Sequence, residues 1–166
     1  MVSFTQKIKS IFASLKHQEK KDMKVQVINK SDNELPRYET GGSSGLDLRA
    51  NIPEDIVLGS LKRVLVPTGL FLSIPEGMEG QIRPKRGVSS KRGLTVLNSP
   101  GTVDSDHRGE VCVLLVNLSR ETVTISKNEL IAQIVFSKVE RIEWEVCDEL
   151  DKTKRGEGGF GSTGTQ

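Results

Sequence analysis

The chain has 166 residues, of which 35% are hydrophobic and 28% are charged, and 24 basic against 22 acidic residues leave a net charge of +2. These values fit one domain with a modest core, and so small a charge creates no global field to attract nucleic acid or a membrane, so neither is expected as a partner. The chain has two cysteines, Cys112 and Cys147, no secretory leader pattern and no apolar run of roughly 18 residues. We therefore expect a soluble protein of a reducing compartment, the cytoplasm.

Residues 1–22 differ from the rest of the chain. Apolar residues recur there at helical spacing, namely Phe4, Ile8, Ile11, Phe12 and Leu15. Five lysines lie between and after them: Lys7, Lys9, Lys16, Lys20 and Lys21. This pattern predicts a short, basic amphipathic helix. We expect an appendage that frays or packs on the body. The alternative is a membrane-surface or targeting segment, which would place the protein in an organelle or the nucleus, and the absence of arginine weighs against targeting.

Residues 23–148 have the pattern of short β-strands. Alternating or continuous apolar runs of strand length occupy 70–74, 111–118, 122–126 and 130–136, and Ile142, Trp144 and Val146 alternate at period two. Prolines and glycines separate these runs at the spacing of a sandwich, barrel or jelly roll, and no helix-length apolar pattern interrupts them. The sequence therefore predicts an all-β domain.

Residues 149–166 predict a flexible arm. Five of the nine residues 156–164 are glycine, so the backbone is free and Phe160 has no local core to enter. A flat ring beside exposed backbone N–H groups, Arg155, Ser162 and Thr163 suits a ligand that has both a planar ring and an anionic end. A nucleotide has both.

A basic segment and a turn-rich segment are the other candidates for chemistry. Residues 82–93 hold five cations, which indicates either a solvated loop or a cradle for a polyphosphate. Residues 98–110 bring an amide, an imidazole, a guanidinium and carboxylates together between two apolar strands. If the backbone is extended, Asp104 and Asp106 share one face and could hold a metal or a water; otherwise Asp104 caps a turn and Asp106 pairs with Arg108.

Several common sites are excluded by spacing. The chain has no EF-hand calcium pattern, no glycine-rich stretch ending in Gly-Lys-Ser or Gly-Lys-Thr, and no metal-spaced cysteine pair.

Taken in order, five blocks resemble the motifs of the trimeric dUTPase family, which hydrolyses dUTP to dUMP and pyrophosphate with magnesium. The blocks are residues 44–48, 84–87, 97–106, 130–133 and 155–164, and the match spans 24–164. The resemblance implies a dUTPase-like jelly roll, or distorted β-barrel, in a homotrimer. Each active site would be assembled from more than one chain and closed by the C-terminal arm.

The resemblance also implies roles for single residues. Asp104 matches the general base that orients and deprotonates the water attacking the α-phosphorus. His107 matches the residue that packs on the deoxyribose, and Phe160 the ring that stacks over the uracil. The remaining positions expected to bind substrate are Lys85, Arg86 and Gly87 in the second motif, Asn98, Gly101 and Val103 around the uracil pocket, Gln133 near the phosphates, and Arg155, Gly161, Ser162 and Thr163 in the arm.

The expected cofactor is Mg2+. By the same resemblance the ion has no direct protein ligand: substrate phosphates and waters hold it near Asp47 and Gln133.

Two positions depart from the family pattern. Lys85-Arg86-Gly87 stands where the second motif reads Arg-Ser-Gly, and His107 replaces a tyrosine. The leading hypothesis is an active dUTP diphosphatase, and the alternative is a dUTP-binding or regulatory homologue weakened at these positions. A dCTP deaminase of the same fold and a purely structural trimer are further alternatives; the first lacks its expected signature, and the second leaves the arm unexplained.

Overall fold

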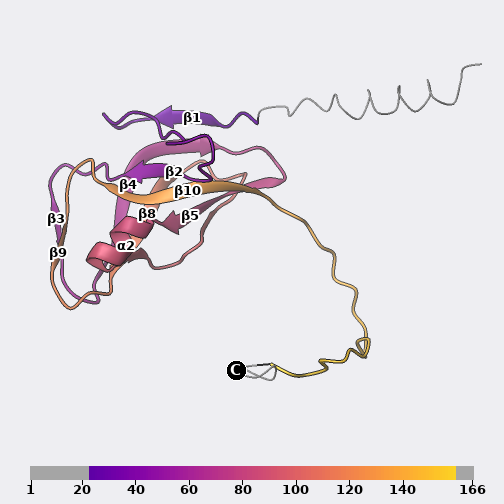
Figure 1. Ribbon diagram of the computed structural model, residues 1–166. Helices are drawn as coiled ribbons and strands as arrows, with labels where there is room; N and C mark the ends of the chain where they lie inside the picture. The colour runs from indigo at the N-terminus through magenta and orange to yellow at the C-terminus, as the bar shows by residue number, and fades with distance from the viewer. Residues whose placement is uncertain (1–22, 160–166) are drawn as a thin grey trace, which may run out of the picture.

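The computed structural model describes residues 23–159, so the predicted N-terminal extension, 1–22, and residues 160–166 of the arm lie outside the described residues. The described part contains ten strands and one short helix (Figure 1). In chain order they are β1 (Gln26–Asn29), β2 (Leu46–Arg49), β3 (Ile56–Leu58), β4 (Arg63–Ser73), β5 (Met78–Pro84), α2 (Arg86–Arg92), β6 (Leu94–Val96), β7 (Gly101–Val103), β8 (Glu110–Asn117), β9 (Val123–Ile125) and β10 (Leu130–Lys138).

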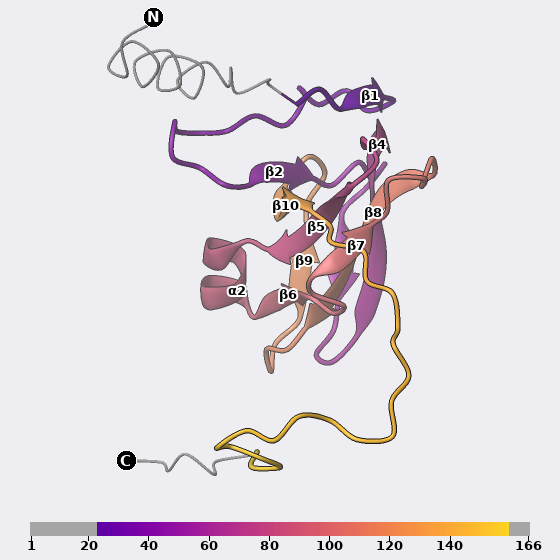
Figure 2. The ribbon, with the colours of Figure 1, turned by 90° about the vertical axis from the view of Figure 1, so that its right-hand side faces the viewer.

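Two four-stranded sheets face each other and form the body (Figure 2). One sheet has the strand order β1-β4-β8-β6, the other has β2-β10-β5-β7, and β3 and β9 form a separate pair. All the pairings are antiparallel. The all-β prediction is confirmed, and no closed barrel forms.

The core lies between the two sheets. Along β8 the side chains of Val111, Val113 and Leu115 are buried, while the residues between them are only partly buried. This is the period-two alternation expected of strands with one face on a core. Ile131, Ala132 and Ile134 of β10 fill the opposite layer.

The strand expected around Trp144 does not form in the single chain. The body ends where the Val139 N–H donates to the Gly77 carbonyl at 2.9 Å, and the chain then runs away from it (Figure 1). Ile142, Trp144 and Val146 are 66%, 91% and 95% exposed. These apolar side chains have the alternation of a strand but no neighbouring strand within residues 23–159.

The second half of the basic segment forms α2, which the absence of an apolar helical pattern did not predict. The helix has no fully buried residue, so its sequence carries no core-facing stripe. Gly93 ends it in the left-handed region at φ 67°, where its N–H donates to the Ser89 carbonyl. Arg92 fixes the helix to the β9–β10 turn by pairing with Glu129 and donating to the Thr124 carbonyl.

No helix within residues 23–159 has the length and apolar character needed to cross a membrane.

Candidate functional site

Strands β2, β10 and β5 bring three of the predicted segments side by side. Gln133 on β10 lies opposite Asp47 on β2 and opposite Arg83 on β5. The Gln133 Nε2 donates to the Pro84 carbonyl at 2.9 Å, and the Lys85 ammonium forms an ion pair with the Asp47 carboxylate. Because these side chains are only 15% to 30% exposed, the ion pair is partly shielded from solvent. We call Asp47, Lys85 and Gln133 the cation-side cluster.

Gly45 fits closely under the Gln133 amide. A Cβ added at Gly45 would lie 2.3 Å from Gln133 Oε1, so only glycine leaves room for the amide in its present position. The sequence had placed Gly45 in the first motif block, 44–48, without giving it a role.

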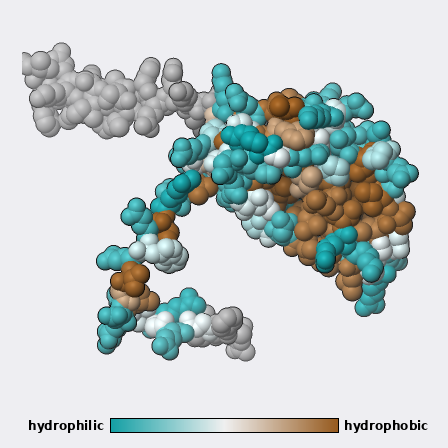
Figure 3. Space-filling model, turned by 180° about the vertical axis from the view of Figure 1, so that it is seen from behind, coloured by the Kyte–Doolittle hydropathy of each residue, from teal (hydrophilic) through white to brown (hydrophobic). Residues whose placement is uncertain are grey.

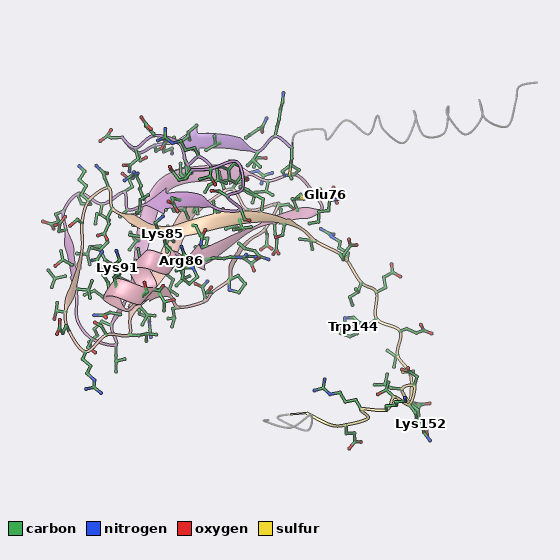
Figure 4. All side chains as sticks on the ribbon, in the orientation of Figure 1. Glu76, Lys85, Arg86, Lys91, Trp144 and Lys152 are labelled. Carbon is green, nitrogen blue, oxygen red and sulfur yellow. The ribbon has the colours of Figure 1, made fainter. Side chains whose placement is uncertain are left out.

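Arg86 and Gly87 begin α2 and are exposed. Figure 4 shows Arg86 beside Lys85 at this end of the sheet. Lys85 is held by Asp47, whereas no other residue in 23–159 hydrogen-bonds or ion-pairs with the Arg86 guanidinium. The cation-side cluster therefore adjoins a guanidinium that is available to a ligand.

The turn before β7 closes on the Asn98 amide. Gly101 is buried, and a Cβ there would lie 3.1 Å from Asn98 Nδ2 and 3.4 Å from Ile82 Cβ. Asn98 is exposed, the Ser99–Pro100 peptide bond is cis, and Val103 is buried at the end of the strand. One three-residue strand thus joins the Asn98 turn to Asp104.

Asp104 begins a tight turn and is exposed. The His107 N–H donates to the Asp104 carbonyl at 3.2 Å, so the expectation that Asp104 and Asp106 share a face of an extended strand is wrong. The alternative pairing of Asp106 with Arg108 is also absent from the described residues, because Arg108 Nη1 donates to the carbonyls of Ser105 and His107 at 2.7 and 2.8 Å.

A cleft of about 540 Å3 opens beside Asp104. Its charged lining comes from three parts of the chain and consists of Glu76, Glu79, Asp104, Asp106, Arg108 and Arg141. Sequence reasoning missed Glu76, Glu79 and Arg141 because they belong to no motif (Figure 4 labels Glu76). The β5–β7 pairing brings the start of β5 beside Asp104, and the β10–β5 pairing brings the end of β10, which Arg141 follows, to the same place.

The two halves of the candidate site lie at opposite ends of β5. Val103 pairs with Gly80 near the start of β5, while Lys85 follows its last residue, Pro84. Position 79, beside Asp104, and Lys85 are six positions apart along the chain, and at the usual rise of a strand this is about 20 Å. One chain therefore does not bring Asp104 and the cation-side cluster together.

The donor atoms around Gln133 suit an outer-shell role toward a magnesium ion. Asp47 and the Gln133 Oε1 offer oxygen, the ligand type Mg2+ prefers, but the Asp47 carboxylate is already paired with Lys85. Within residues 23–159 no three Asp, Glu, His or Cys side chains gather in a way that could hold a metal. The described residues thus fit an ion that reaches them through water and ligand oxygens.

Both cysteines are free thiols, Cys112 half-buried and Cys147 exposed. Burial, with a smaller contribution from the Glu110 carboxylate, raises the pKa of the Cys112 thiol. Cys112 is therefore a protonated, packing thiol at neutral pH.

The described residues define an all-β subunit built from two four-stranded sheets, and comparison with known proteins makes the class specific. The dUTPase family model matches residues 31–164. A deoxyuridine 5'-triphosphate nucleotidohydrolase of Fusobacterium nucleatum is 58% identical over 87% of this chain and 99% of its own length.

Solved structures agree on the fold. A Staphylococcus bacteriophage 80alpha dUTPase solved with dUpNHpp is 25% identical over 85% of this chain and 98% of its own, with a TM-score of 0.73. The dUTPase of phage phi11 of S. aureus, described with a structural Mg(II) ion, is 21% identical over 78% of this chain and 99% of its own, with a TM-score of 0.69. The chain belongs to the dUTPase family.

Proposed function

We propose that this chain is a dUTP diphosphatase, which hydrolyses dUTP to dUMP and pyrophosphate. The observation that carries the proposal is that β7 joins a turn closed on the Asn98 amide to an exposed carboxylate, Asp104, with only three residues between Pro100 and Asp104. In this proposal the group that recognises the base and the group that activates water flank the same three-residue strand. The family membership and the names of its relatives support the same activity.

In this proposal the Asn98 turn, with Gly101 and Val103, reads the uracil. An amide offers both a donor and an acceptor to the polar edge of the base, so cytosine would leave buried groups unpaired and would be rejected. His107 packs on the deoxyribose. Asp104 takes the proton from the water that attacks the α-phosphorus, a general-base role worth about 100- to 10,000-fold in rate.

The phosphates need cations. A triphosphate carries about four negative charges near neutral pH, which repel an attacking hydroxide-like water unless positive groups offset them. Lys85, Arg86 and the Gly87 backbone are proposed to bind these oxygens, with Arg155 of the arm. Arg155 is exposed and its Nε donates to the Gly158 carbonyl at 2.7 Å.

Mg2+ is the proposed cofactor, held by the substrate and by waters near Asp47 and Gln133. When bound, it would neutralise phosphate oxygens and orient the leaving pyrophosphate. Gln133 is already positioned by its bond to Pro84, and Asp47 by Lys85.

The arm is proposed to close the site. Phe160 would stack on the uracil, and Gly161, Ser162 and Thr163 would contact the phosphates; these four lie outside the described residues. Closure would exclude bulk water and align the attack.

We propose a homotrimer with shared active sites. The separation of about 20 Å along β5 means that Asp104 and Lys85 can meet at one substrate only if they come from different chains. Seen from behind, the sheet that contains β4 and β8 carries a broad hydrophobic area (Figure 3), and Leu65 and Leu97 are 60% and 47% exposed. Patches of this kind mark interaction surfaces.

The division into an extension (1–22), a β domain (23–148) and an arm (149–166) belongs to the same proposal. Residues 139–148 would complete the domain only against a neighbouring chain, where Trp144 could be buried. The two free cysteines support a cytoplasmic location.

Hydrolysis of dUTP, dCTP, dTTP and UTP, measured side by side, tests the proposal. Of the four nucleotides, we expect only dUTP to release pyrophosphate at a high rate. The Asp104→Asn variant should have a kcat at least about 100-fold below the wild-type value. Asp106→Asn, two residues away in the same turn, is the matched control and should retain activity. Ammonia release from dCTP, or full turnover in Asp104→Asn, would refute the assignment.

A further inference from the structure

The edge strands β1 and β2 of the two sheets lie on the same side of the body (Figure 2). An apolar groove lies between them and is lined by residues of both sheets. Its volume is about 170 Å3, which suits one or two apolar side chains and is below the size usual for a small-molecule pocket. We call it the edge groove, and its lining is Val25, Val27, Leu35, Pro36, Leu46, Leu48, Leu70, Leu72, Ile134 and Phe136.

The edge groove is incompletely covered by the described residues. Val27 and Leu35 are 39% and 50% exposed, although both border the buried core residues Leu48 and Leu70. All four residues of β1 are exposed, so the strand covers the core poorly on this side. Apolar surface at the edge of a core is stabilised when another apolar surface removes it from water.

The chain itself supplies an apolar segment next to the groove. Met23 is the first residue that the structure describes, and Val25, two residues later, already lines the groove. Residues 1–22 place Phe4, Ile8, Ile11, Phe12 and Leu15 at the spacing of one helical face. Residues 16–22 can span roughly 20 Å when extended, enough to bring such a face back over the groove.

The segment is an addition to the family pattern. The match with the Fusobacterium protein takes in 99% of that protein but 87% of this chain, and the family model ends at residue 164. The unmatched residues therefore lie mainly at the N-terminal end, where the edge groove opens.

Charge also favours the contact. Residues 1–22 contain five lysines against Glu19 and Asp22. The loop that carries Leu35 into the groove holds Asp32, Glu34 and Glu39 against two cations, Lys30 and Arg37, and the Glu34 and Glu39 side chains are 89% and 61% exposed. Docking of the basic segment there would bring it to a loop with one excess negative charge, which adds only a small, salt-dependent attraction.

We propose that residues 4–15 dock their apolar face in the edge groove of their own chain and complete the core between β1 and β2. The segment then acts as a clamp on the open side of the sandwich. This inference does not depend on the catalytic proposal, because none of its residues belongs to the candidate site.

Hydrogen exchange of the full-length protein tests the clamp. The apolar-face variant Ile11→Asp/Phe12→Asp should speed exchange of the β1 and β2 amides about tenfold, and deletion of residues 1–22 should do the same. Ser10→Asp/Ser14→Asp adds the same charge off that face and is the matched control, with no change expected. Adding Leu35→Asp to the apolar-face variant should give no further acceleration, since both changes break one contact.

Three outcomes would overturn the proposal. The first is unchanged exchange after deletion. The second is opening of the groove by Trp144→Asp but not by deletion, which would make a partner's residues 140–147 the occupant. The third is loss of binding to anionic phospholipid vesicles on deletion with no change in exchange. Turnover of dUTP, recorded for the deletion and for the variants at positions 10, 11, 12 and 14, should stay at the wild-type level; its absence from the wild type would defeat the catalytic proposal and leave the clamp standing.

Discussion

Gly45 and Gln133 face each other so closely that a Cβ on Gly45 would lie 2.3 Å from Gln133 Oε1. Gly45→Ala must therefore push the amide aside and weaken its bond to the Pro84 carbonyl, 2.9 Å long. We expect kcat/KM for dUTP to fall about 10- to 100-fold, because displacement of a positioning group by about 1 Å has effects of this size. The free energy of unfolding should fall by only about 1 kcal/mol.

Gly41→Ala is the control for this change, because a Cβ at Gly41 meets nothing within 4 Å. Steady-state kinetics at several magnesium concentrations, with thermal unfolding, compare the two variants. If Gly45→Ala keeps wild-type kcat/KM, Gln133 has no part in substrate or magnesium binding.

Mixed oligomers test whether the active site is shared. Asp104→Asn and Lys85→Gln should each be nearly inactive alone, because one lacks the base and the other a phosphate cation. Co-expression at equal levels should restore roughly a quarter of wild-type activity, the fraction of sites that receive both intact groups by random assembly of different chains.

The background for this experiment is the activity of the two variants purified separately and then mixed under conditions in which their subunits do not exchange. Were Asp104 and Lys85 to serve the same site from one chain, no mixture would exceed that background. The position of the two residues beyond opposite ends of β5 makes this result unexpected.

Much of this architecture was predictable from the sequence, because it depends on local patterns. Alternating apolar residues located β8, β9 and β10. The roles given to Asp104, Asn98 and Gln133 stay predictions. Strand register was not predictable. The contact between Gly45 and Gln133 follows from the pairing of β2 with β10, and the separation of Asp104 from Lys85 follows from the pairing of β5 with β7.

Two parts of the structure were not predicted correctly, and each has a physical reason. Helix α2 carries no fully buried residue, so its segment has no helical apolar period to detect. The turn at Asp104 is fixed by the His107 N–H rather than by side-chain pattern, and an extended backbone was the wrong assumption there. Ile142, Trp144 and Val146 do alternate as predicted, but a strand needs a neighbour, and residues 23–159 of one chain supply none.

The residue at position 107 should set sugar selectivity. The His107 ring lies over the backbone at Gly109, where an added Cβ would come within 2.7 Å of its Cε1. His107→Tyr extends the ring toward the sugar and should raise the ratio of kcat/KM for dUTP to that for UTP by about tenfold, a range typical of steric discrimination. His107→Phe separates ring size from the hydroxyl, and equal selectivity of all three proteins would count against a sugar contact.

Arg86 is expected to act as a phosphate clamp. Its guanidinium is exposed and makes no hydrogen bond or ion pair with residues 23–159, while the neighbouring Lys85 is held by Asp47. Arg86→Ser should raise KM for dUTP about tenfold, because a hydrogen bond to a charged group is worth about 1.5 kcal/mol or more. It should also weaken inhibition by pyrophosphate and reduce the salt dependence of KM.

Lys91→Ser provides the matched control, since it removes an exposed cation from the other end of α2 (Figure 4). Its KM should stay at the wild-type value, because Lys91 neither lines the cleft beside Asp104 nor pairs with the cation-side cluster. A higher kcat in Arg86→Ser would mean instead that the guanidinium occupies space the phosphates need. Measuring kcat and KM separately distinguishes the two, since a clamp acts on KM and an obstruction on kcat.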